Sequence, residues 1–253
     1  ENGSVDEVMV FSAVDLSHWG DISNPFPGGG TMSFGDAIDT NSKFLFIGAP
    51  GSIDDAGTVY VFNNQPPFAH REQIFNATVV NFNYGESISA SDEYIAATGR
   101  GSGTYIAQIN RNDIGNSFPL LGYPKNLTNN TSFGAKIAQA GKYTLVTAST
   151  ADTGNEHGLG AVYVYDSETG FYEFTIRATE GRIDRQTNQF GNNLVSYGTE
   201  VFVGANFGSL EDFTDNASGI VYVYNMMKQS SLISDIESAQ DPQSIVERVN
   251  EWL

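Results

Sequence analysis

The sequence predicts an all-β protein built from four copies of one repeat. An aromatic–glycine pair recurs at Phe34-Gly35, Tyr84-Gly85, Phe133-Gly134 and Phe190-Gly191, with spacings of 50, 49 and 57 residues. Short runs of Val, Ile, Tyr and Phe follow each pair, with Gly and Asp between them, as is typical of strands joined by tight turns. Helical periodicity is missing from residue 1 to about residue 228, which favours strands throughout this region.

Each repeat contains the same three strand-like runs in the same order. The first run follows the aromatic–glycine pair. The second and third runs are Phe44–Ile47 with Val59–Phe62, Tyr94–Ala97 with Tyr105–Ala107, Tyr143–Thr147 with Val162–Tyr165, and Val201–Ala205 with Val221–Tyr224. The third runs are apolar or aromatic at every position, which predicts strands buried on both faces.

A fourth strand is expected after the third run of each repeat. Candidates are Gln73–Thr78, a segment near Phe118–Gly122, and Phe174–Thr179, but none follows Tyr224. The N-terminal run Val8–Val14 is therefore expected to complete the last sheet as a clasp between the two chain ends, because ring closure removes exposed sheet edges. The resulting fold is a four-bladed β-propeller over residues 1–228, with blades that start near residues 34, 84, 133 and 190.

The repeated sequence motif resembles the FG-GAP repeat of integrin α-subunit propellers. The matching residues are Phe34-Gly35 with Gly48-Ala49-Pro50, Phe133-Gly134 with Thr147-Ala148, and Phe190-Gly191 with Gly204-Ala205. Many members of that family carry an Asp-rich calcium loop between the first two strands. Here that connection is a short turn in every repeat, too short and too poor in carboxylates for a calcium cage, so the family's calcium sites are not expected.

The composition changes after Asn225. Ser234 to Glu237 has the spacing of a capping box, and Asp241-Pro242 is a second helix start. Ile245, Val249 and Trp252 then fall on one stripe, so residues 229–253 are expected to form a helical tail with an amphipathic helix over 242–253. This helix either packs against the propeller itself, or docks on another subunit or anchors a following domain. Val8, Val10, Phe11, Ile245, Val249 and Trp252 are the candidate assembly residues.

Charge and composition exclude several classes of partner. The net charge is −18 and there are no cysteines. Such a surface repels nucleic acid and anionic lipid, and disulfides, thiolate metal sites and cysteine nucleophiles are excluded. No apolar run approaches the length of a membrane span. The chain starts at Glu1 without an apolar leader, so we expect a mature or trimmed product.

Six Asn-X-Ser/Thr acceptors point to glycosylation and an extracellular or cell-surface location. The alternative is an Asn- and Ser-rich loop protein in which these triplets arise from composition. The acceptors are Asn2, Asn76, Asn126, Asn129, Asn130 and Asn216.

Catalytic motifs are missing from the sequence. His18, His70 and His157 lie in unlike contexts, and Gly28–Gly30 lacks the residues of a phosphate-binding loop. Carboxylates are concentrated in the loops between second and third strands, where a weak divalent-cation site, calcium included, is an alternative to solvated turns. They are Asp54, Asp55, Asp152, Glu156, Glu211, Asp212 and Asp215.

These features predict a non-enzymatic extracellular module for adhesion, without a cofactor, that binds a protein or a glycan. The alternative is a structural protomer of a glycosylated filament or surface layer, in which a terminal strand or helix engages identical subunits.

Overall fold

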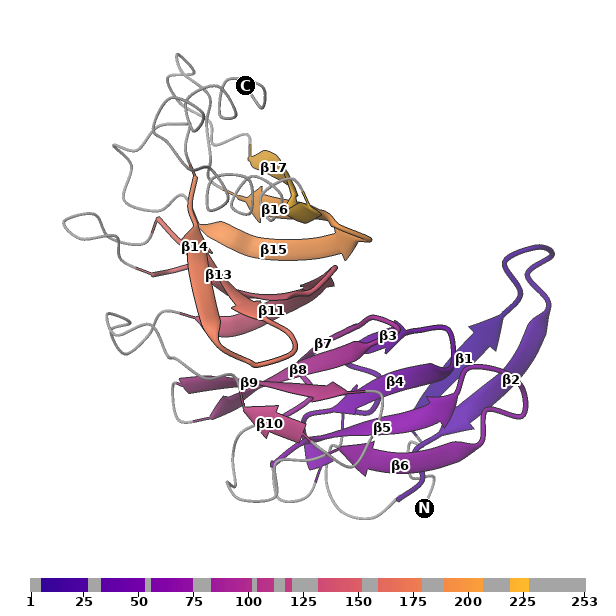
Figure 1. Ribbon diagram of the computed structural model, residues 1–253. Coiled ribbons are helices and arrows are strands. Elements are labelled where there is room, and N and C mark those ends of the chain that lie inside the picture. The colour runs from indigo at the N-terminus through magenta and orange to yellow at the C-terminus, as the bar shows by residue number, and fades with distance from the viewer. Residues whose placement is uncertain are drawn as a thin grey trace, which may run out of the picture.

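The computed structural model describes residues 6–26, 33–52, 56–74, 83–101, 104–111, 117–119, 132–151, 159–178, 189–206 and 219–227 (Figure 1). Its seventeen strands form one hairpin and four antiparallel sheets, so the all-β prediction is confirmed.

Each sheet is a meander of consecutive strands. Sheet 1 contains β3 (Ile38–Thr40), β4 (Phe44–Ala49), β5 (Thr58–Asn63) and β6 (His70–Ile74); sheet 2 contains β7 (Ser87–Ala90), β8 (Tyr94–Gly101), β9 (Thr104–Arg111) and β10 (Ser117–Pro119). Sheet 3 contains β11 (Phe133–Ala140), β12 (Tyr143–Ala148), β13 (Ala161–Asp166) and β14 (Tyr172–Ile176); sheet 4 contains β15 (Phe190–Tyr197), β16 (Glu200–Ala205) and β17 (Ile220–Asn225). The hairpin consists of β1 (Glu7–Phe11) and β2 (His18–Ser23).

The sheets follow one another face to face, from the hairpin at one end through sheets 1, 2 and 3 to sheet 4 at the other (Figure 1). A separate apolar cluster fills each of the four interfaces. Side chains alternate along the third strand, so one strand contributes to the interfaces on both faces of its sheet. In sheet 1, Val59 and Val61 face sheet 2, whereas Tyr60 and Phe62 face the hairpin. The third strands are therefore buried on both faces in sheets 1 and 3.

Glycine allows the close approach of consecutive sheets. Gly57 forms a parallel bridge with Tyr84, and Gly160 forms the equivalent bridge with Phe190. A Cβ at either glycine would lie 2.1 Å from a backbone atom of the next sheet. Both glycines also have positive φ, +75° and +82°, which L side chains rarely adopt. The aromatic of the next repeat is thereby fixed in the interface, and burial raises the pKa of Tyr84.

Polar groups link the first strands of neighbouring sheets. Asp39 Oδ2 accepts a hydrogen bond from the Ala90 amide at 2.7 Å, and Ser89 Oγ accepts one from the Gln139 amide at 2.9 Å. Ser196 Oγ donates to the Gln139 carbonyl oxygen at 2.6 Å. Desolvation raises the pKa of Asp39 against the opposing effect of the bond from Ala90.

The expected clasp at the chain ends is wrong. The sequence predicts that Val8–Val14 pairs with the last sheet, but β1 pairs with β2, and sheet 4 has three strands within the described ranges. Val8, Val10 and Ile22 instead belong to the apolar cluster that contains Phe34, Tyr60 and Phe62. A local hairpin closes a short loop and still buries this apolar face, so it gains the burial at low entropic cost.

Candidate binding face

The outer face of sheet 4 carries a row of exposed apolar side chains, Val195, Tyr197, Val221 and Val223, which are 61%, 81%, 66% and 59% exposed. The row follows from strand alternation, because Tyr222 and Tyr224 of β17 point toward sheet 3 and leave the valines on the other face. Burial raises the pKa of Tyr224 to about 12, so this tyrosine is neutral at physiological pH.

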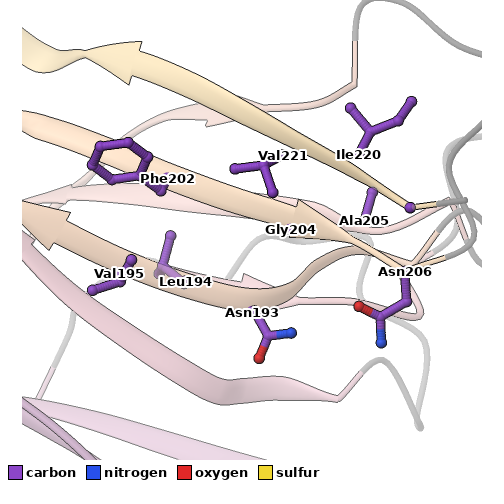
Figure 2. Close-up of a pocket in the computed structure, with 10 residues that line it drawn as sticks. Asn193, Leu194, Val195, Phe202, Gly204, Ala205, Asn206, Ile220 and Val221 are labelled. Carbon is purple, nitrogen blue, oxygen red and sulfur yellow. The ribbon is translucent and has the colours of Figure 1, made fainter. Parts of the chain in front are cut away.

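A hollow on this face combines an apolar floor with two amide side chains (Figure 2). Phe202 and Val195 lie toward one end and Asn206 toward the other, with Val221 and Asn193 between them. The remaining lining residues are Leu194, Gly204, Ala205, Gly219 and Ile220. None of the described residues that line the hollow is titratable, and this part of the lining offers apolar contact and amide hydrogen bonds.

The equivalent residues of sheet 1 contact the next sheet. Val59 and Val61 correspond to Val221 and Val223 and are fully buried against sheet 2. Gly57, which corresponds to Gly219, touches Tyr84 of sheet 2. Among the described residues, a Cβ at Gly219 would meet the carbonyl oxygens of Ala205 and Asn206, at 3.6 Å or more. Sheet 4 thus presents an interface face that no described residue covers.

Only part of the sequence-predicted site falls within the described ranges. Val8 and Val10 are half-buried against sheet 1, while Phe11 is 52% exposed and its ring lies 5.3 Å from that of His18. His18 Nε2 contacts Asp21 Oδ1 at 2.7 Å on the exposed side of the hairpin. The acidic candidates Asp54, Asp55, Asp152, Glu156, Glu211, Asp212 and Asp215, all six glycosylation asparagines, His157, and Ile245, Val249 and Trp252 lie outside those ranges.

Sequence reasoning missed the sheet 4 face because it treated Val221–Tyr224 like the third strands of the other repeats. The available signal was the lack of a further aromatic–glycine pair after β17, since the aromatic residue of each such pair packs against the preceding sheet. Among the residues that the structure places, no group of three or more His, Asp or Glu side chains is arranged to hold a metal ion.

The fold and this face define a class, an all-β repeat protein with an apolar sheet face at one end that none of the residues placed by the structure covers. Within the described part of the chain, no helix has the length and apolarity needed to traverse a lipid bilayer. No protein-family model matches the chain, and no curated protein matches it. Among solved structures, the chain is similar to the crystal structure of TolB from Acinetobacter baumannii, with 10% identity, a TM-score of 0.45 and coverage of 76% of this chain and 41% of that one. The chain thus spans about two fifths of the length of that protein.

Proposed function

We propose that the chain is a β-propeller of the FG-GAP type that acts as a non-enzymatic extracellular adhesion module and binds a protein partner through the outer face of sheet 4. The observation that carries this proposal is the row of exposed apolar side chains on β15 and β17, beside the hollow that Asn193 and Asn206 help to line. An exposed apolar patch with polar groups at its rim is typical of a protein-binding surface.

The chemistry of the face supports binding more than catalysis. Its aromatic and aliphatic side chains supply contact area, and the two asparagines supply hydrogen bonds that fix orientation. The extracellular location rests on the six glycosylation triplets in the sequence.

The test is an adhesion assay with beads coated with the full chain, on a panel of immobilised extracellular-matrix proteins and on a glycan array. The double variant Val221→Asp/Val223→Asp places two charges on the face at positions that are already exposed, so it should fold normally and bind at least about tenfold more weakly. The matched control is Phe171→Asp, which changes a 57% exposed ring on sheet 3. Binding that survives the double variant, or no binding to any member of the panel, would refute the proposal.

A second candidate function is the protomer of an extracellular assembly. Its support is a second exposed apolar surface, Met9, Phe11 and Trp19 on the hairpin at the opposite end of the stack. Two unlike faces at opposite ends permit a head-to-tail contact, which generates rings or filaments. Sedimentation velocity tests this candidate: a single monomeric species at high protein concentration would exclude it.

A further inference from the structure

The turn between β1 and β2 has the same backbone frame as the turn between β13 and β14. The two turns are Ser12–Ser17 and Asp166–Phe171, of equal length. In each, the amide of the first residue donates to the carbonyl oxygen of the last, at 2.8 Å and 2.9 Å respectively. The amide of the fifth residue donates to the carbonyl oxygen of the first, from Leu16 at 2.9 Å and from Gly170 at 2.8 Å. The two turns can therefore be compared residue by residue.

The fifth residue of this frame has a left-handed backbone conformation. Its φ is +73° at Gly170 and +59° at Leu16. Glycine adopts this conformation without steric cost, whereas leucine is strained there. The side chain of Leu16 is 77% exposed, so its contacts with the described residues do little to offset the strain. Residues held in such a conformation are concentrated at functional sites.

The third residue of the turn differs in the same direction. It is the exposed Glu168 in sheet 3, but in the hairpin it is Val14, which is 97% exposed. Val14 and Leu16 thus flank Asp15 at an apolar tip, which we define as these three residues. Hydrogen bonds from the side chains of Ser12 and Ser17 hold the pKa of Asp15 below its ordinary value, so this carboxylate is charged at neutral pH.

The hollow on sheet 4 has the complementary chemistry. Its volume is about 560 Å³, within the range of sites that hold a small ligand. Phe202 and Val221 offer apolar contact to aliphatic side chains, and the amide groups of Asn193 and Asn206 can donate to a carboxylate. The described lining contains no carboxylate that would repel Asp15.

We propose that the apolar tip is a docking element that inserts into the sheet 4 hollow of a second copy of this chain. The proposal rests on the second candidate function above and names the contact through which that assembly forms. The hairpin and sheet 4 lie at opposite ends of the stack (Figure 1), so the contact is head-to-tail and each copy can engage two neighbours. A lipid surface fits the tip less well, because the charge of Asp15 is costly to bury in hydrocarbon.

The experiment is sedimentation velocity over a concentration series with two variants of the full chain. The tip variant Val14→Glu/Leu16→Gly gives the hairpin turn the residues of the sheet 3 turn. The hollow variant Val221→Asp places a carboxylate at a 66% exposed residue of the lining. Each variant alone should associate at least about tenfold more weakly than the unmodified chain, because burial of one leucine side chain contributes more than tenfold to an association constant.

A mixture of the two variants gives the most specific readout. The tip variant retains its hollow and the hollow variant retains its tip, so an equimolar mixture should form a dimer and no larger species. The control Phe171→Asp changes an exposed ring in the equivalent turn of sheet 3 and should associate like the unmodified chain. The tip variant should have an equal or higher unfolding midpoint in urea, because glycine relieves the strain at residue 16.

The outcomes separate this contact from the proposed functions. If the chain assembles and both variants assemble equally well, the second candidate function stands and the tip contact is overturned. If the chain is monomeric at every concentration, the second candidate function is excluded, and a cyclic peptide of residues 11–18 decides the contact: its addition should shift the NMR signals of the Asn193 and Asn206 side-chain amides, and unchanged signals would overturn the proposal. Adhesion is a separate test, since the tip variant leaves the sheet 4 face unchanged.

A third arm distinguishes a lipid occupant. The unmodified chain is sedimented with phosphatidylcholine vesicles, beside the tip variant. We expect both proteins to remain in the supernatant. Binding of the unmodified chain that is lost in the tip variant would assign the tip to a membrane surface and overturn the proposal.

Discussion

Gly160→Ala tests whether consecutive sheets are held together by backbone contact at glycine. The added Cβ would lie 2.1 Å from the Phe190 carbonyl oxygen, 2.8 Å from its amide nitrogen and 2.9 Å from the Ser149 carbonyl oxygen. All three are backbone atoms, so no side chain can rotate away. The interface between sheets 3 and 4 would have to open by most of an ångström to remove the clash.

The expected cost has two parts. Residue 160 has φ +82°, and an L residue there costs about 1–2 kcal/mol of strain. Overpacking of an interface typically costs a further 1–3 kcal/mol. We therefore expect Gly160→Ala to lower the free energy of unfolding by about 2–5 kcal/mol, a large fraction of the stability of a typical domain.

Gly219→Ala is the matched control. Gly219 has φ +75° and occupies the same position in sheet 4, but the nearest atom of the described residues would lie 3.6 Å from its added Cβ. This variant should show the strain alone, about 1–2 kcal/mol. Urea denaturation followed by circular dichroism measures both variants. Equal destabilisation would refute the reasoning, because it would mean that the close approach of sheet 4 contributes nothing.

Two further predictions concern the interfaces between sheets. Burial raises the pKa of Asp39 and disfavours its charged form in the folded state, so ionisation of Asp39 lowers the stability as the pH rises above 3.8. Asp39→Asn should abolish this fall in stability. Urea unfolding across this pH range measures the effect, and a pH profile equal to that of the unmodified protein would contradict the prediction. Phe190→Ala should cost about 3–5 kcal/mol, because its fully buried ring packs 5.2 Å from that of Tyr222; Phe171→Ala, at an exposed ring, should change the unfolding midpoint little.

The repeats could be predicted from the sequence because the features that define them depend on neighbouring residues. The aromatic–glycine pair requires a positive φ at the glycine, observed at Gly35, Gly85, Gly134 and Gly191, and the alternating apolar third strand is visible in any one repeat. These requirements are met within a few residues of chain. The strand pairing of sheets 1 and 3 follows from consecutive segments in the same way. The fourth strands are β6 (His70–Ile74) and β14 (Tyr172–Ile176), which begin three and two residues before the expected Gln73–Thr78 and Phe174–Thr179.

The strand with which Val8–Val14 pairs could not be predicted in this way. Its apolar pattern fits a third strand as well as the missing fourth strand of the last repeat. The structure shows instead the pairing of Phe11 with His18 that the third strands β5 and β13 make with their own neighbours. Register is a property of two strands together, so one strand considered alone leaves it undetermined.

The sequence by itself determined that this protein consists of repeated antiparallel sheets, because backbone conformation and side-chain alternation are set by neighbouring residues. Only the tertiary structure decided which sheet faces are covered. Val59 and Val221 have the same local sequence context, yet the first is fully buried and the second is 66% exposed. In the described part of the chain, Val59 has a following sheet to pack against and Val221 has none, and that depends on residues far away along the chain.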